Sequence, residues 1–319
     1  MKKITALIMS IMFLLGAIGC VPNTDLSLTL DTSCWSNKTN ASEKYEKCVY
    51  NVERVDVRTN TTVASGTLTY VIDFDHNVNE LYYLSLSTDF SLTYNDNAPQ
   101  ADRGKTDTIT SKTVFLGSAL VPKSVDKKVV LAPRDGVVND SYELSTNYET
   151  YTSTLTFTSK DAPVSTLNFK DNYLNEVYES DMLLYVVRAF KQLVSNGTRY
   201  PFSVVNMFDC HTYDKKFATT PMTFYTNATG EEEAMAFPSL SSYLDEQGSL
   251  MAIKTTISIN KQNSGPAIIA KYSKTPFKLP DGSENEKVLV YYETQEYDVV
   301  AKEKSYVNKY TLSSYAHEE

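Results

Sequence analysis

Apolar and polar residues alternate along most of the chain, and this two-residue period predicts β-strands. The clearest runs place apolar side chains on one face at Leu68, Tyr70, Ile72 and Phe74; Tyr82, Leu84 and Leu86; Tyr151, Leu155 and Phe157; and Ile253, Ile257 and Ile259. Ser and Thr fill many positions between them, as expected where one face of a sheet meets water. Turn-forming residues separate the runs, for example at 95–99 and 280–282. The pattern therefore predicts antiparallel strands joined by turns.

One segment, residues 172–194, has apolar residues at helical spacing instead. The residues that carry this spacing are Leu174, Val177, Leu184 and Leu193. Acidic residues lie towards its beginning and Arg188 lies near its end, which suits the helix dipole. The run 182–187 is almost continuously apolar, so we expect this helix to be covered on more than one side. A short second helix is expected at 239–247, ended by Gly248.

A helix between two groups of strands predicts an α+β, mainly β fold. We expect a strongly curved antiparallel sheet, half-barrel-like, that wraps one long central helix. This layout resembles the half-barrel of some bacterial lipoprotein carriers, in which a concave sheet faces helices across a cavity that holds acyl chains. The resemblance is one of layout, since no motif of that family matches. Residues 45–319 are expected to form one domain with the helix at 172–194; two β domains joined near residues 160–172 are the alternative.

The first twenty residues have the order of a secretory signal. Lys2 and Lys3 precede the apolar stretch 4–15, which is too short to span a membrane. The following Ala17-Ile18-Gly19-Cys20 resembles the lipobox of bacterial lipoproteins. That resemblance implies removal of residues 1–19, a diacylglycerol group on the sulfur of Cys20, and an acyl group on its amine. An ordinary signal peptide, in which Cys20 has no role, is the alternative.

The lipobox also predicts where the protein works. The lipid on Cys20 makes the membrane a partner and anchors the chain outside the cytoplasm, at the periplasmic face or the cell surface. Residues 20–44 are expected to form a tether and an N-terminal segment. The net charge of −9 and the pI near 5.0 argue against nucleic acid as a partner, because phosphate binding requires a basic surface.

An extracytoplasmic location decides how the remaining cysteines are interpreted. Cys34 and Cys48 are able to pair as a disulfide, with two buried thiols as the alternative. Cys210 stands beside His211, but neighbours on a strand point to opposite faces. We therefore expect Cys210 to be structural rather than a nucleophile.

Candidate chemistry is sparse. The residues expected to contact a ligand or partner are Leu174, Val177, Tyr178, Leu184 and Tyr185 on the helix. A weaker polar candidate is the strand face that carries Asp209, His211 and Tyr213. The run that starts at Asp73 has alternating oxygen-bearing side chains, but it lacks the Gly and Glu that a calcium loop requires. No metal, cofactor or catalytic residue is predicted, because no nucleophile, phosphate-loop or metalloprotease motif is present.

Two functions from different classes follow from these observations. The favoured one is a non-enzymatic, lipid-anchored binding or accessory protein. It holds an apolar small molecule between helix and sheet, or presents a surface to another envelope protein. The alternative is an envelope hydrolase acting on glycans or peptides, which predicts converging carboxylates or a role for His211. A continuous cavity beside the helix would support the carrier form, and solid packing there would oppose it.

Overall fold

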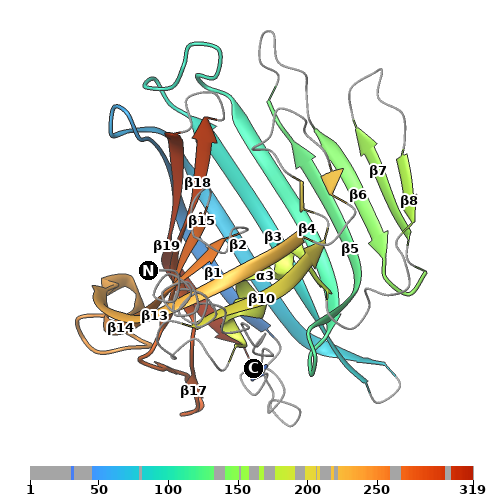
Figure 1. Cartoon of the computed structure of the whole chain (residues 1–319). Helices are drawn as coiled ribbons and strands as arrows, with labels where there is room; N and C mark the ends of the chain where they lie inside the picture. Colours follow the sequence, from blue (N-terminus) through green and yellow to red (C-terminus); the bar gives the residue numbers. More distant parts are fainter. Residues whose placement is uncertain are drawn as a thin grey trace, which may run out of the picture.

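The computed structural model describes thirteen segments of the chain. They are residues 30–31, 45–78, 81–132, 141–150, 152–157, 165–168, 177–190, 198–205, 207–208, 217–218, 222–258, 267–298 and 303–318. These residues form strands, one short α-helix and two 3-10 helices, and the helix and strands are labelled in Figure 1 where there is room.

The first half of the chain is almost entirely strand. Its elements are β1 (Tyr45–Asp56), β2 (Thr61–Val78), β3 (Leu81–Tyr94), β4 (Thr106–Leu116), β5 (Val121–Val130), β6 (Tyr142–Asn147), β7 (Thr152–Phe157) and β8 (Ser165–Asn168). The middle contains β9 (Val177–Glu179), η3 (Ser180–Met182), α3 (Leu183–Arg188), β10 (Thr198–Val205), β11 (Met207–Phe208) and β12 (Phe217–Ala218). The remainder comprises β13 (Met222–Ala236), η5 (Pro238–Leu240), β14 (Ser249–Ser258), β15 (Ala267–Ser273), β16 (Phe277–Lys278), β17 (Glu284–Asn285), β18 (Leu289–Asp298) and β19 (Glu303–Glu318).

Fifteen of these strands hydrogen-bond into one sheet, in the order β8-β7-β6-β5-β4-β3-β2-β1-β19-β18-β15-β14-β13-β10-β9. From β1 the chain builds outward, strand by strand, to β8 at one edge. It then builds inward from β9 at the other edge and ends with β19 beside β1. Neighbours are antiparallel, except that β9 and β10 run parallel. The strands before and after α3 therefore belong to one continuous sheet.

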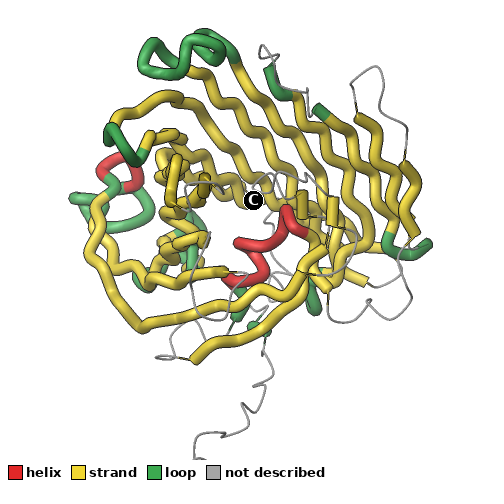
Figure 2. Tube along the Cα trace, turned by 45° about the horizontal axis from the view of Figure 1, so that its top comes forward, coloured by secondary structure: helices red, strands yellow, loops and turns green. Residues whose placement is uncertain are grey.

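The sheet curls around α3 without closing into a barrel (Figure 2). Within the described residues its two edges are β8 and β9, which are not paired with each other. Lys127 of β5 lies 2.5 Å from Asp181, which follows β9, so the β9 end approaches the inner face of β5. The predicted curved, mainly β antiparallel sheet is thus confirmed, in the form of an open spiral rather than a half-barrel.

The alternation read from the sequence matches the burial of the strands. In β2, Leu68, Tyr70 and Ile72 are buried on the concave face, and in β3 the same holds for Leu84 and Leu86. The side chains between them are largely exposed or half-buried, apart from Ser85. The concave side chains and α3 form one continuous apolar core. A smaller cluster, made mainly by β5 to β7, contains Val125, Val129, Tyr142, Leu144, Tyr148 and Leu155.

The long helix predicted at residues 172–194 is wrong. Residues 177–179 form β9, and only 180–188 are helical, as η3 followed by α3. Residues 172–176 and 191–194 lie outside the described residues. Val177 and Tyr178 pair with Ser203 and Val204 of β10, so sheet pairing outweighs the helical period at β-favouring residues. The apolar run 182–187 is indeed buried on all sides.

The second helix predicted at 239–247 is largely absent. Only η5, at Pro238–Leu240, is helical, and turns follow it. Gly248 does end this segment with a φ of +64°. Its carbonyl accepts a 2.8 Å hydrogen bond from the amide of Phe237, which closes the loop before β14 begins.

Candidate functional site

The helix α3 packs against the concave face. Side chains from Met182 to Phe190 are at most 7% exposed. The ring of Tyr185 meets that of Tyr70 edge to face, with ring centres 5.4 Å apart, and the hydroxyl of Tyr272 donates a 2.6 Å hydrogen bond to the carbonyl of Leu184. Because these side chains are closely packed, α3 acts as part of the core and not as one wall of an open cavity.

A buried ionic centre holds α3 to the sheet. Arg188 is 1% exposed, and its guanidinium donates hydrogen bonds to Glu46 Oε1 at 2.7 Å and to Asn285 Oδ1 at 2.9 Å. Asn285 Nδ2 in turn donates to Glu46 Oε2 at 2.8 Å and to the hydroxyl of Tyr315 at 2.6 Å. The two charges therefore satisfy each other away from water, and this centre is structural rather than accessible to a ligand.

The concave face continues beside α3 with four tyrosines of the sheet: Tyr50, Tyr70, Tyr292 and Tyr310. Tyr292 and Tyr310 stack with their ring centres 4.0 Å apart and their planes within 5°. Tyr50 contacts Tyr70 and Tyr292 edge to face, and its hydroxyl donates to the carbonyl of Leu289 at 2.8 Å. Burial raises the pKa of Tyr70 to about 12, so its phenol stays neutral at physiological pH. The cluster presents ring faces and neutral hydroxyls, not charge.

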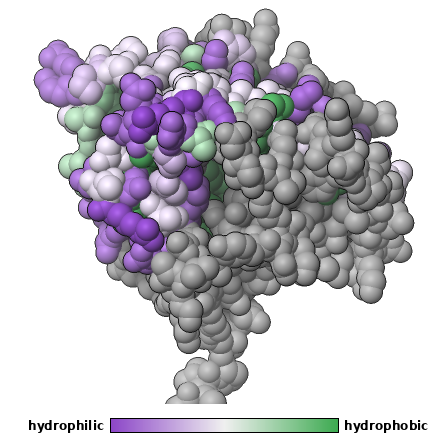
Figure 3. Space-filling model, turned by 90° about the horizontal axis from the view of Figure 1, so that it is seen from above, coloured by the Kyte–Doolittle hydropathy of each residue, from purple (hydrophilic) through white to green (hydrophobic). Residues whose placement is uncertain are grey.

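Three aromatic side chains of the concave face are only partly buried near the end where β1 and β18 end and β19 begins, although neighbours such as Leu92 are buried. We call Phe90, Tyr306 and Tyr310 the aromatic rim; all three are only partly buried against the core. Arg54 lies over the ring of Tyr306, 4.2 Å from its centre, and pairs with both carboxylate oxygens of Glu296. Seen from above, the described surface is mostly hydrophilic with scattered apolar residues (Figure 3). The rim is therefore an aromatic surface bordered by polar groups.

Two contacts, which we call the closing contacts, join the β9 end of the spiral to the wall opposite. Lys127 of β5 pairs with Asp181, and the hydroxyl of Tyr148 donates to Glu179. Burial lowers the pKa of Lys127, but the Asp181 carboxylate outweighs this and raises it above its ordinary value. Lys127 therefore remains a cation at neutral pH, and side chains rather than backbone pairing join the β9 end of the spiral to β5 and to the turn after β6.

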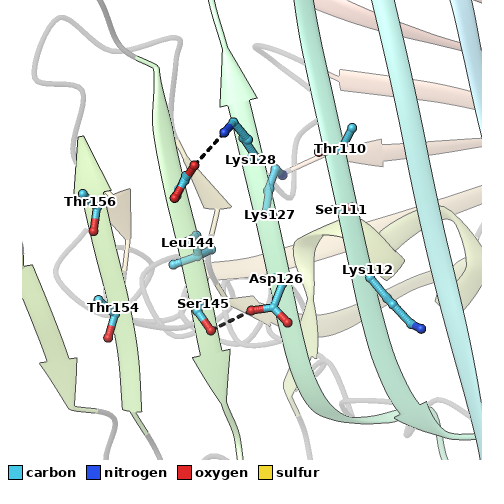
Figure 4. Close-up of a pocket in the computed structure, with 11 residues that line it drawn as sticks. Thr110, Ser111, Lys112, Asp126, Lys127, Lys128, Leu144, Ser145, Thr154 and Thr156 are labelled. Carbon is cyan, nitrogen blue, oxygen red and sulfur yellow. Dashed lines mark hydrogen bonds and ion pairs between the residues drawn. The ribbon is translucent and has the colours of Figure 1, made fainter. Parts of the chain in front are cut away.

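A hollow of about 570 Å³ lies on the opposite, convex face of β4 to β7 (Figure 4). Its lining is Thr110, Lys112, Asp126, Lys128, Glu143, Ser145, Thr154 and Thr156, with the inward-facing residues Ser111, Lys127 and Leu144 between them. Lys128 pairs with Glu143 at 2.8 Å, and Ser145 donates to Asp126 at 2.7 Å. Because its charges are exposed and of both signs, the hollow offers little binding energy. The concave face is the stronger candidate.

The structure places the residues predicted for a ligand or partner face in different parts of the fold. Leu184 and Tyr185 lie in the core, and Tyr178 is half-buried against it. Val177 belongs to β9, and Leu174 lies outside the described residues. The polar candidates Asp209, His211 and Tyr213, together with Cys20 and Cys210, also lie outside them.

Cys48 is a free thiol in this structure, and Cys34 lies outside the described residues, so their pairing stays a prediction. Cys48 is buried, and its Sγ lies 3.7 Å from Glu46 Oε1. Burial, reinforced by the Glu46 carboxylate, raises the pKa of the thiol well above its usual range. A thiol in this environment is a poor nucleophile.

The ionic residues of the concave face were not predicted from the sequence as part of the site; they are Glu46, Arg54, Lys127, Asp181 and Arg188. A signal was present for some of them. Glu46 shares the two-residue period of Cys48, Tyr50 and Val52, and Lys127 stands between Val125 and Val129. A charged residue on the apolar face of a strand indicates a buried partner, although it does not say which residue that partner is.

Among the described residues, no group of three or more His, Cys, Asp or Glu side chains is arranged to hold a metal ion. The same residues include no helix with the length and apolarity needed to cross a bilayer.

No family model and no curated protein matches this chain. A crystal structure from Brucella abortus is similar in fold, and its title describes a beta-barrel-like protein of domain of unknown function DUF1849. The alignment covers 86% of this chain and 98% of that one, with a TM-score of 0.51 and 10% sequence identity. At this identity the similarity concerns the fold alone: the chain has a barrel-like β fold.

Proposed function

We propose that this protein is a lipid-anchored, extracytoplasmic binding protein that holds the apolar part of a ligand against its aromatic rim. One observation carries the proposal: the side chains of α3 are buried, whereas Phe90, Tyr306 and Tyr310 on the same concave face are only partly buried. Partly exposed aromatic side chains inside a curved sheet are typical of small-molecule sites. The barrel-like fold supports the same proposal.

The position of the ligand differs from the one expected from the sequence. Packing around Leu184 and Tyr185 opposes a ligand held between helix and sheet. The rim offers apolar rings next to the Arg54–Glu296 pair, whose opposite charges cancel and so add no net charge. An uncharged apolar group therefore fits the rim better than an ion does.

Substitution of Phe90 by alanine is expected to weaken ligand binding about tenfold. A lost aromatic contact is worth about 1.4 kcal/mol, which corresponds to that factor. The probe is N-phenyl-1-naphthylamine, an uncharged dye whose fluorescence rises in apolar sites, titrated into delipidated protein. The control is Met251→Ala, since Met251 is a large apolar side chain exposed elsewhere on the surface. Absence of saturable dye binding to the native chain would count against the proposed function.

Substitution of Cys20 by alanine is expected to abolish lipid attachment, because the lipobox resemblance places the diacylglycerol on the sulfur of this residue. The measurement is incorporation of labelled palmitate in cells that express the protein, followed by mass spectrometry of its N-terminus. Cys210→Ala is the matched control and should retain full labelling. Undiminished label in the Cys20 variant would show that the predicted lipid attachment at Cys20 is wrong. It would not bear on the proposed binding site at the aromatic rim.

A further inference from the structure

Five side-chain oxygens in the described part of the chain are buried without a hydrogen bond; Thr255 Oγ1 lies apart on β14, and the other four lie together on or against the concave wall. These four are the hydroxyls of Thr88, Ser111 and Thr113, and Oδ2 of Asp181; none has a partner within the described part of the chain. Ser111 is 8% exposed and Thr113 is fully buried. Buried polar groups are rarely left unbonded in proteins, and a cluster of them calls for an explanation.

The strand register brings these groups together. Thr88 of β3 lies directly opposite Ser111 of β4, and Ser111 lies opposite Lys127 of β5. Directly paired side chains are about 5 Å apart at Cβ, so these three form a polar row across the wall. Thr113 shares the face of Ser111 two residues further along β4. Asp181 reaches the row from η3 through its ion pair with Lys127.

The chemistry of the row favours an uncharged group that both donates and accepts hydrogen bonds. Threonine and serine hydroxyls do both, and Asp181 Oδ2 accepts. The charges of Lys127 and Asp181 cancel, and the nearby Glu179 carboxylate adds a negative charge, so the site does not attract an anion. A carboxylate would have to compete with Asp181 for Lys127 while facing the second oxygen of Asp181, which is unfavourable. A hydroxyl-bearing group meets the hydroxyls of the row without this repulsion.

The polar row adjoins an apolar row that leads towards the rim. Phe90 follows Thr88 by two residues on β3, Ile109 precedes Ser111 by two on β4, and Val129 follows Lys127 by two on β5. Because side chains two apart share a face, the concave wall changes from polar to apolar in one step. Phe90 in turn contacts Tyr310 of the rim, with ring centres 6.5 Å apart.

We propose that the ligand is a single-chain amphiphile with an uncharged, hydroxyl-bearing head group, its head on Thr88, Ser111 and Thr113 and its chain along Phe90 towards the rim. This inference rests on the proposed function, since it names the ligand class of the same concave face. The selectivity of the site then depends on the hydroxyls of Thr88, Ser111 and Thr113, which make no hydrogen bond within the described part of the chain.

The test compares three ligands that share a twelve-carbon chain. Monolauroylglycerol, laurate and methyl laurate each displace N-phenyl-1-naphthylamine from the delipidated full chain. Monolauroylglycerol is expected to bind at least tenfold more tightly than the other two. In Ser111→Ala and Thr113→Val this advantage should disappear, while the affinity for methyl laurate stays unchanged. Thr110→Ala, on the opposite face of the same strand, is the control and should keep the full preference.

The outcomes separate the inference from the function on which it rests. Equal affinity for all three ligands, or a preference that survives both substitutions, would overturn the head-group assignment and leave the binding function standing. Preference for laurate would overturn it in favour of an anionic head. Displacement by none of the three would remove the binding function as well. Neither variant should unfold at a lower urea concentration than the native chain, because each removes a buried hydroxyl without a partner.

Discussion

Replacing Arg188 with methionine is expected to destabilise the protein by about 3–5 kcal/mol, because the buried Glu46 carboxylate loses its counter-charge. Both side chains are 1% exposed, so water does not reach the charge that remains. The substitution also removes the hydrogen bonds from the guanidinium to Asn285 and to the carbonyl of Glu286. Urea unfolding followed by far-ultraviolet circular dichroism measures the change.

Two comparisons test whether burial of the pair is the cause. Lys128→Ala breaks an exposed pair with Glu143 and should cost less than about 1 kcal/mol. The double variant Glu46→Met with Arg188→Met removes both charges and should be more stable than Arg188→Met alone. If the double variant were the less stable of the two, the uncompensated charge would not be the source of the loss.

Replacing Gly248 with alanine is expected to cost about 2–4 kcal/mol of stability. Gly248 has a φ of +64°, which strains any residue with a β-carbon. A Cβ built there would lie 2.0 Å from the carbonyl oxygen of Phe237 and 2.4 Å from its carbonyl carbon. Because these are backbone atoms of the closed loop before β14, the loop itself has to move.

Gly104 provides the matched control. It also has a positive φ, +70°, but nothing lies within 4 Å of a Cβ at this position. Gly104→Ala should therefore cost only about 1 kcal/mol, the conformational part of the effect. The difference between the two variants in thermal or urea unfolding measures the steric part at Gly248. Equal losses of stability in the two variants would mean that the loop at Gly248 accommodates the added Cβ without an energetic cost.

The strands were predictable because burial repeats with the geometry of a pleated sheet. Leu68, Tyr70 and Ile72 face the core at a two-residue period, and no distant information was needed to see this. Curvature was also inferable, since an apolar segment between two sets of strands must be covered. The open ends were not inferable, because closure depends on which strand edges meet in space.

The helix prediction went wrong where a local period competed with distant pairing. Val177 and Tyr178 fit a helical stripe, yet β10 offers them backbone partners 26 residues further along the chain. Sheet pairing satisfies their amides and carbonyls and suits their β-favouring side chains. Only the continuous apolar run 182–187 stayed helical, where packing covers it from every side.

The charged residues of the concave face were likewise predictable from the sequence only in part. Inward-facing charges such as Glu46 and Lys127 stand out from their strand pattern, so their presence was readable from the sequence. Their partners were not, because Arg188 is 142 residues from Glu46 and Asp181 is 54 residues from Lys127. Such pairs depend on the spiral as a whole, which brings β1 and β5 against the segment that follows β9.

The side-chain closure of the spiral has a consequence for how this architecture can vary. In a closed barrel the number of strands and their stagger together set the internal radius, so gaining or losing a strand reshapes the lumen. Here the β9 end meets β5 through Lys127 and Asp181, and the sheet continues past that point to β8. The radius of the sheet around α3 therefore does not depend on the total number of strands. Related chains are free to gain or lose strands at the β8 edge while keeping the same packed centre.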